Sequence, residues 1–179
     1  MLNRIGISGP PGSGKTTVAK LLSERTSMKL YSMGMLFREI AKEKGLSLNE
    51  LSSIAEEDRS IDELIDKRQI EILKSAGVIM DSRLSCWLME RSSMPGSKLK
   101  VWITAPFEVR AERIAKREGK STEEVKDLLR HRESSEAVRY KTYYGIDIRD
   151  VSIYDIVINN SWLSAEECCD ILLSAMKVE

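Results

Sequence analysis

Two kinds of hydrophobic pattern alternate along this chain of 179 residues. Short β-branched or apolar runs predict five strands, at 4–8, 29–32, 77–81, 99–104 and 155–159. Apolar residues recurring at helical spacing predict eight helices, at 15–25, 34–44, 47–57, 60–75, 84–91, 107–118, 121–142 and 164–176. This alternation is typical of right-handed βαβ units, so we expect an α/β fold with a five-stranded parallel sheet flanked by helices.

The segment 34–75 interrupts the alternation because it holds three helical patterns and no strand pattern. Ser47 and Ser60 stand at the starts of two of these helices, with Glu50 and Glu63 three residues on. This spacing is that of the capping box, in which the serine and the glutamate satisfy the free N–H groups of the first turn. We therefore predict a helical insert within the strand and helix core.

Composition narrows the class of protein. Lys and Arg number 28, as do Asp and Glu, so the chain lacks the excess positive charge needed to coat nucleic acid or an acidic membrane. No apolar run approaches the roughly 18 residues of a membrane span. Cys86, Cys168 and Cys169 form an odd set without metal-ligand spacing, which indicates reduced thiols. We expect a cytoplasmic protein with neither nucleic-acid nor membrane partners.

A complete phosphate loop follows the first predicted strand. Its predicted contacts to the nucleotide are Gly9, Pro10, Pro11, Gly12, Ser13, Gly14, Lys15, Thr16 and Thr17. The glycines let backbone N–H groups converge on phosphate oxygens, at the positive end of the following helix. Lys15 is expected to bridge the β- and γ-phosphates, and Thr16 to bind Mg²⁺. The motif therefore predicts ATP and Mg²⁺ as cofactors.

Asp81 ends a buried strand, and ligands of parallel sheets lie beyond the carboxyl ends of the strands. A carboxylate there suits a water-mediated contact to Mg²⁺. A capping role, or an ion pair with Arg83 or Lys15, fits the sequence as well. Asp81 is thus a candidate metal residue with both interpretations open.

Arginines suggest what receives the phosphoryl group. The chain has no [NT]-K-x-D segment of the kind that reads guanine in switch GTPases. A small phosphotransferase must neutralise the phosphates of two substrates, and the arginine fork matches phosphate geometry. Arg38 and Arg83 follow strand ends and favour ligand binding, whereas Arg110 and Arg130 are more typical of ion pairs on solvated helix faces. His131 lies in a charged helical stretch, so we expect a solvated imidazole.

With these motifs, the chain resembles the archaeal-type cytidylate kinases within the nucleoside monophosphate kinases. The matching segments include ISGPPGSGKTTVAKLL (7–22), VIMDSRLSCWL (78–88) and KVWITAPFEVRAERIAKRE (100–118). The most specific one has Arg132, Glu136 and Arg139 at helical spacing, followed by Tyr144-Gly145-Ile146-Asp147. Together the matches cover nearly the whole chain.

The resemblance implies a P-loop kinase in three parts. The core comprises 1–33, 76–116 and 143–179, the acceptor-binding helical insert is 34–75, and a short lid spans about 117–132. It implies transfer of the γ-phosphoryl of MgATP to CMP, and to dCMP, by a monomer with small-molecule substrates. The acceptor phosphate is largely a dianion near neutral pH, since its second pKa is about 6, so no protein base is required.

The resemblance also implies roles for particular side chains. The catalytic set is Lys15, Arg113, Arg117 and Arg132. The acceptor-binding set is Arg38, Arg83, Arg132, Glu136 and Arg139, and the metal set is Thr16 and Asp81. One residue departs from the family pattern, because Ser82 stands where similar kinases usually carry glycine between the acid and the arginine. A side chain at that position puts the contact geometry of Arg83 in doubt.

Two other functions remain open at this point. One is a P-loop kinase for a different small acceptor, such as UMP, AMP or shikimate. The other is a non-kinase module that binds ATP and switches a partner protein. The arginine cluster argues against the second, because a switch has no use for a second phosphate site.

Overall fold

The computed structural model describes residues 4–92 and 96–176. The strands are β1 (Arg4–Ser8), β2 (Lys29–Ser32), β3 (Val78–Asp81), β4 (Lys98–Thr104) and β5 (Ile156–Asn159). The helices are α1 (Lys15–Thr26), α2 (Met33–Glu43), α3 (Leu48–Glu57), α4 (Ser60–Leu73), α5 (Ser85–Arg91), α6 (Phe107–Glu118), α7 (Thr122–Tyr144) and α8 (Ala165–Met176). Every predicted element is present, and its ends lie within two residues of the predicted ones.

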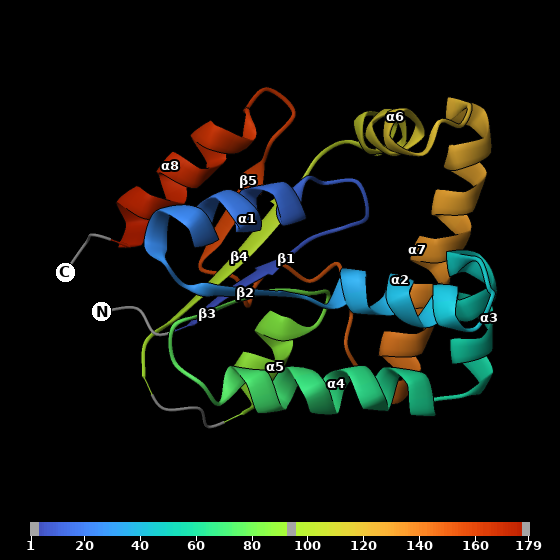
Figure 1. Cartoon of the computed structure of the whole chain (residues 1–179), viewed down its shortest axis with the longest axis horizontal. Coiled ribbons are helices and arrows are strands. Elements are labelled where there is room, and N and C mark those ends of the chain that lie inside the picture. The colour runs from blue at the N-terminus through green and yellow to red at the C-terminus, as the bar shows by residue number, and fades with distance from the viewer. Residues whose placement is uncertain (1–3, 93–95, 177–179) are drawn as a thin grey trace.

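The strands form one parallel sheet in the order β2-β3-β1-β4-β5. In the register of the central strand, Ile5 pairs with Ile79 on β3 and with Leu99 on β4. The chain therefore leaves β1 at the middle of the sheet, with β3 on one side and β4 on the other. The loops after β1 and β3 consequently emerge side by side at the carboxyl edge (Figure 1).

Helices cover both faces of this sheet. Alternate residues of a strand point to opposite faces. Thus Ile5 and Ile7 join a core with α1 and α8. Gly6 points the other way, toward α5, where an added Cβ would lie 2.7 Å from the Sγ of Cys86. The absence of a side chain at Gly6 lets α5 pack directly against the central strand.

The predicted insert forms α2, α3 and α4, which share a second core containing Phe37 and Leu51 and reaching Met80 of β3. Ser47 and Glu50 make the expected capping box. The second capping prediction is wrong. Ser60 is the first residue of α4, and its N–H donates to Oδ1 of Asp58 at 2.9 Å, because that carboxylate two residues earlier reaches the free N–H group.

Helix α7 links the two halves of the molecule. Its first turns pack on α6, above the sheet, and its later turns run along α3 of the insert (Figure 1). One rigid helix can therefore present side chains to both ends of the space between the sheet edge and the insert.

Within the described residues, we find no helix that is both long and apolar enough to cross a membrane.

Candidate active site

The loop between β1 and α1 has the backbone that a phosphate cradle needs. Gly9, Gly12 and Gly14 all have positive φ, a region that favours glycine. An added Cβ on Gly9 would clash with the carbonyl oxygen of Ile103, and one on Gly12 would lie 2.7 Å from that of Arg110. Two of the glycines are thus required by close packing as well as by backbone conformation, and the loop is fixed against β4 and α6.

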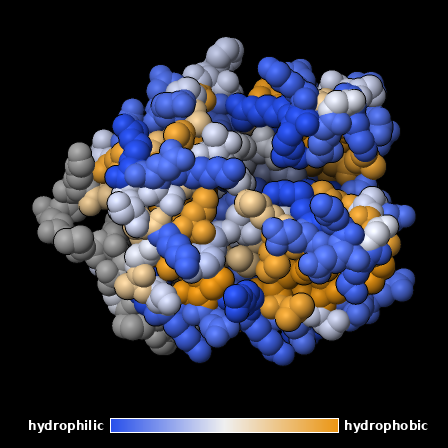
Figure 2. All heavy atoms as spheres, viewed as in Figure 1, coloured by the Kyte–Doolittle hydropathy of each residue, from blue (hydrophilic) through white to orange (hydrophobic). Residues whose placement is uncertain are grey.

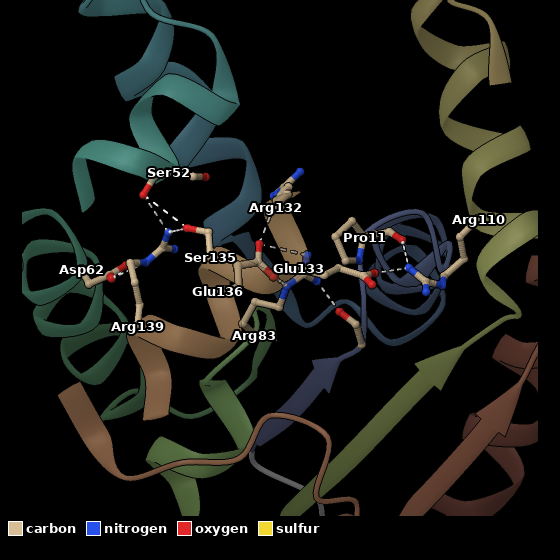
Figure 3. A network of polar contacts seen from close by, with 11 residues as sticks. Pro11, Ser52, Asp62, Arg83, Arg110, Arg132, Glu133, Ser135, Glu136 and Arg139 are labelled. Atoms are coloured by element: carbon tan, nitrogen blue, oxygen red, sulfur yellow. Dashed lines mark hydrogen bonds and ion pairs between the residues drawn. The ribbon is translucent and has the colours of Figure 1, made fainter. Parts of the chain in front are cut away.

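Arg110 anchors this loop from α6. It is only 7 % exposed, which contradicts the prediction of an ion pair on a solvated helix face. Its Nε donates to the carbonyl of Ala105 at 2.9 Å. One terminal nitrogen donates to the carbonyl of Pro11 at 3.0 Å and to Glu133 of α7 (Figure 3). A buried arginine with fixed acceptors holds the phosphate loop, α6 and α7 in one arrangement.

Asn160 anchors the loop from the end of β5. Its side-chain nitrogen donates to the carbonyl of Ser13 at 2.7 Å. Its side-chain oxygen accepts a hydrogen bond from Arg113 at 3.0 Å, and its carbonyl accepts another at 3.1 Å. Arg113 is therefore held beside the phosphate loop, on the side where the donor phosphates are expected.

Asp81 meets the phosphate loop at the sheet edge. Its Oδ2 accepts hydrogen bonds from the hydroxyl of Thr16 at 2.6 Å and from that of Ser32 at 2.8 Å. Its Oδ1 is buried and lacks a hydrogen-bond partner among the described residues. Mg²⁺ prefers oxygen ligands and keeps several waters, so a hydroxyl beside a carboxylate with one free oxygen fits this ion. Thr16 and Asp81 are the residues that can hold it.

Lys15 begins α1 within the same group of charges. Burial, with the positive charge of Arg83 as the next cause, lowers the pKa of Lys15 to about 7. Asp81 acts in the opposite direction and is the smaller influence. A lysine in this position loses its proton more easily than usual, and an anion bound beside it would favour the charged form.

A cleft of about 610 Å³ opens between the sheet edge, the insert and the α6–α7 pair. Figure 2 shows the surface hollowed between the region of α6 and the helical insert. The predicted residues that line the cleft are Pro11, Gly12, Gly14, Lys15, Thr16, Thr17, Arg38, Asp81, Arg83, Arg113, Arg117, Arg132, Glu136 and Arg139. Gly9, Pro10 and Ser13 are not among the lining residues. Gly9 contributes its carbonyl oxygen, which accepts a hydrogen bond from Arg83.

The centre of the cleft holds a carboxylate between two arginines. Glu136 of α7 accepts from Nε of Arg83 at 2.7 Å and from Nε of Arg132 at 3.1 Å (Figure 3). Burial alone would raise the pKa of Glu136, but the two guanidinium groups outweigh it and the pKa lies at about 2. Glu136 is therefore ionised at neutral pH, and it fixes both arginines at the cleft wall.

Arg139 lies one turn further along α7, where the structure gives it protein partners. Its Nε donates to Oδ2 of Asp62 at 2.8 Å, and a terminal nitrogen donates to the carbonyl of Ser52 and to the hydroxyl of Ser135 (Figure 3). The Asp62 and Arg139 side chains are 7 % and 3 % exposed. This pair ties α7 to the insert at the end of the cleft distant from the phosphate loop.

Arg38 of the insert lies within reach of the charges of Arg117 and Arg132. Partial burial and the charges of Arg117 and Arg132 lower the pKa of Arg38. Arg117 pairs with its exposed neighbour Glu118 at 2.6 Å. Arginines whose charges oppose one another are stabilised by an anion placed between them. The structure therefore places Arg38 and Arg117 on one cleft, where an anion between them would relieve their repulsion.

The two remaining predictions about charged residues are confirmed. Arg130 is exposed and pairs with Asp127 at 3.0 Å, and His131 is exposed.

Arg110 and Asn160 were missed as site residues. The sequence carried a signal for each: Arg110 shares a helix face with Phe107 and Ile114, and Asn160 follows the carboxyl end of a strand. A third missed group, on α4, is treated below.

Comparison with known proteins assigns the family. The family model described as Cytidylate kinase-like family matches residues 4–162. The chain belongs to this family. A cytidylate kinase from Methanocaldococcus jannaschii is 43% identical over 172 residues, covering 96% of each chain. One from Archaeoglobus fulgidus is 46% identical over 177 residues, covering 98% of this chain and 96% of that one. The membership confirms the expected nucleoside monophosphate kinase.

Solved structures agree on the fold. The shikimate kinase from Bacteroides thetaiotaomicron has a TM-score of 0.63 at 16% identity, covering 99% of this chain and 100% of that chain. The shikimate kinase from Aquifex aeolicus has a TM-score of 0.53 at 24% identity, covering 97% and 96%. At these identities the similarity shows only that the chain has a P-loop kinase fold.

Proposed function

We propose that this protein transfers the γ-phosphoryl group of MgATP to the 5′-phosphate of CMP and of dCMP, giving ADP and the nucleoside diphosphate. The observation that supports the proposal is one cleft lined both by the phosphate-loop motif and by arginines. The phosphate loop with Lys15 lies at one end, and Arg38, Arg83 and Arg132 line the same cleft. Curated relatives named cytidylate kinase, over nearly the full chain, support CMP as the acceptor.

At the donor end, the loop N–H groups and Lys15 bind the β- and γ-phosphates, and Arg113 flanks them. Thr16 and Asp81 would hold Mg²⁺. When bound, Mg²⁺ neutralises phosphate charge and supplies Lewis-acid stabilisation of the transferring group. These residues orient the γ-phosphorus toward the middle of the cleft.

At the acceptor end, Arg38 and Arg83 bind the 5′-phosphate, with Glu136 holding Arg83 and Arg132 in place. The acceptor oxygen is already anionic near neutral pH, so the protein need not remove a proton. Catalysis then comes from alignment of the two phosphates and from stabilisation of their negative charge by Lys15 and the arginines. Arg117 approaches from the lid segment and helps to exclude water.

We also propose that the protein acts in the cytoplasm as a monomer. Cys86, Cys168 and Cys169 are all free and buried, which supports a reducing compartment. The substrates are small molecules that fit the cleft.

The direct test follows the γ-phosphoryl group itself. ATP labelled at the γ-phosphorus is incubated with the protein, Mg²⁺ and CMP, and the products are separated. We expect the label in CDP, with one ADP formed for each CDP. Label released as inorganic phosphate at the same rate with and without CMP would instead identify an ATP-hydrolysing module.

A further inference from the structure

Helix α4 presents a row of polar side chains to the cleft. Asp62, Asp66 and Gln69 are spaced by four and three residues, which places them on one helix face. All three line the cleft and are buried, with exposures of 5%, 8% and 2%. Buried carboxylates and amides are costly unless they are hydrogen-bonded, so the partners of each polar atom indicate what the row is for.

Protein groups satisfy most of this row. Arg139 pairs with Asp62, as described above. The side-chain nitrogen of Gln69 donates to Oδ1 of Asp66 at 2.9 Å, and its oxygen accepts from the hydroxyl of Ser82.

Oδ2 of Asp66 is buried and has no hydrogen-bond partner among the described residues. The hydroxyl of Tyr144, which also lacks another partner in the described part of the chain, faces this carboxylate from α7 and lowers its pKa by donating to it. A carboxylate has about four lone-pair sites, so Asp66 keeps acceptor capacity toward the cleft that it lines.

Ser82 fixes the orientation of the Gln69 amide that contacts Asp66. Its hydroxyl bonds to the oxygen of the Gln69 amide, and its Oγ accepts from the N–H of Leu84 at 3.2 Å. This fixes which end of the amide faces Asp66, so that the amide nitrogen donates to Oδ1 and not to Oδ2. The serine that departs from the family pattern is thus the start of a chain of hydrogen bonds, next to Arg83, that leads to Asp66.

The remaining acceptor capacity of the Asp66 carboxylate requires a ligand that donates a hydrogen bond. An ionised carboxylate can only accept hydrogen bonds. The amino group of cytosine is a donor, whereas uracil carries a carbonyl oxygen at the same ring position and would place two acceptors against each other. We propose that Asp66, oriented by Gln69 and Ser82, accepts a hydrogen bond from the cytosine amino group and so selects cytidine over uridine monophosphates. This rests on the proposed function and identifies the group that reads the base.

The protonation state of Asp66 gives this role a signature. The charged or titratable groups that face it are Asp62 on the same helix, Arg59 at the helix start and Tyr144 of α7. Burial is the main influence, and it raises the pKa of Asp66 to about 6. Below that pH the carboxylic acid can donate to the uracil carbonyl. The preference for CMP over UMP is therefore expected to shrink as the pH falls from 7.5 to 5.5.

The test measures kcat/KM for CMP and for UMP separately, at saturating MgATP and pH 7.5. Asp66→Asn keeps the shape and offers a donor, so the CMP to UMP ratio is expected to fall by at least about tenfold. The matched control is Glu71→Gln, an acid-to-amide change on the same helix where the side chain is 71% exposed, and it leaves the ratio unchanged. A purely structural role for Asp66 lowers both values equally and overturns the proposal.

The wild-type protein provides a test that does not depend on the folding of a variant. Its CMP to UMP ratio is measured between pH 5.5 and 8, where effects of pH on transfer itself cancel in the ratio. We expect the ratio to rise through about pH 6 and to be flat in Asp66→Asn. A wild-type ratio that is flat across this range contradicts the role of Asp66 while leaving CMP kinase activity intact. Absence of CMP-dependent turnover would instead contradict the proposed function.

Discussion

The Nε atom of Arg83 lies 2.7 Å from Oε2 of Glu136, which joins the end of β3 to the middle of α7. The side chains of this pair are 12% and 6% exposed. The carboxylate also pairs with Arg132, so it balances part of the positive charge that lines the cleft. Like charges held together without such a carboxylate would destabilise the empty protein.

This pairing makes a prediction for stability against pH. The pKa of Glu136 is lowered from about 4.5 to about 2 in the folded protein, so its contribution to stability is complete above about pH 4.5 and is lost as the pH falls toward 2. We expect Glu136→Gln to lower the free energy of unfolding at pH 7 and the difference from wild type to shrink below pH 4.5. Urea unfolding of both proteins at several pH values measures the difference in free energy of unfolding. A difference that does not change with pH contradicts a stabilising role for the ionised Glu136.

Lys15 gives a prediction for catalysis. Lys15→Met removes the charge that bridges the β- and γ-phosphates, so we expect transfer to fall by about 10³, or about 4 kcal/mol of transition-state stabilisation. Steady-state turnover measures it, with circular dichroism to check the fold. Turnover within about tenfold of wild type would remove Lys15 from the donor site.

The pKa of about 7 at Lys15 adds a test of the same residue through protons. Bound ATP restores the charge, so binding takes up a proton at pH 8 but little at pH 6, and ATP affinity weakens as the pH rises above about 7. Calorimetry of ATP binding at pH 8, in two buffers of different ionisation enthalpy, measures the number of protons taken up for each ATP bound. Uptake that persists in Lys15→Met would assign it to another group.

Arg38 and Arg113 separate the acceptor from the donor. Arg38 lines the cleft from the insert, whereas Arg113 is held beside the phosphate loop by Asn160. We expect Arg38→Ala to weaken CMP binding and slow transfer with little change in ATP binding to the empty enzyme. We expect Arg113→Ala to act at the donor end, and Arg117→Ala to act mainly on transfer with both substrates present, because a residue of the expected lid reaches the phosphates on closure. Titrating ATP and CMP separately into each variant measures the two affinities. If Arg38→Ala loses ATP binding but keeps CMP binding, Arg38 belongs to the donor end and the assignment is wrong.

Arg110 is expected to position the phosphate loop without contacting substrate. Lysine keeps the charge toward Glu133 but cannot also reach the Ala105 and Pro11 carbonyls, so Arg110→Lys should lower kcat/KM for ATP by about tenfold, or about 1.4 kcal/mol. Arg130→Lys is the matched control, because Arg130 is exposed and also lies over the ring of Phe107. Equal effects of the two changes would show that the Arg110 contacts do not matter to the loop.

Local patterns were enough to predict the elements and the phosphate loop from sequence. A strand, a glycine loop and a helix are contiguous, so their geometry follows from neighbouring residues, and parallel strands bring Asp81 to the loop because their carboxyl ends share an edge. The prediction for Ser60 failed because Asp58 competed for the same N–H group. That outcome depends on backbone angles that capping patterns do not specify.

Long-range partners could not be predicted in the same way. Arg110 resembles any helix-surface arginine in sequence, and only the fold brings Glu133 of α7 to it. Likewise the ion-pair partner of Arg139, Asp62, lies on the insert. The polar row of α4 was equally hidden, since Asp66 and Gln69 become notable only once both are buried beside Ser82. Tertiary contacts decide which of several similar charged residues form the site.

Competition between acceptors tests the central claim, transfer to a cytosine nucleotide, most directly. CMP, dCMP, UMP and AMP are supplied together at equal concentration with fixed MgATP at pH 7.5, and the diphosphates are separated and quantified at early times. The account predicts CDP and dCDP as the main products, with UDP lower by about tenfold or more and ADP formed only from the donor. AMP or UMP as the preferred acceptor, or ATP consumption that ignores every acceptor, contradicts it.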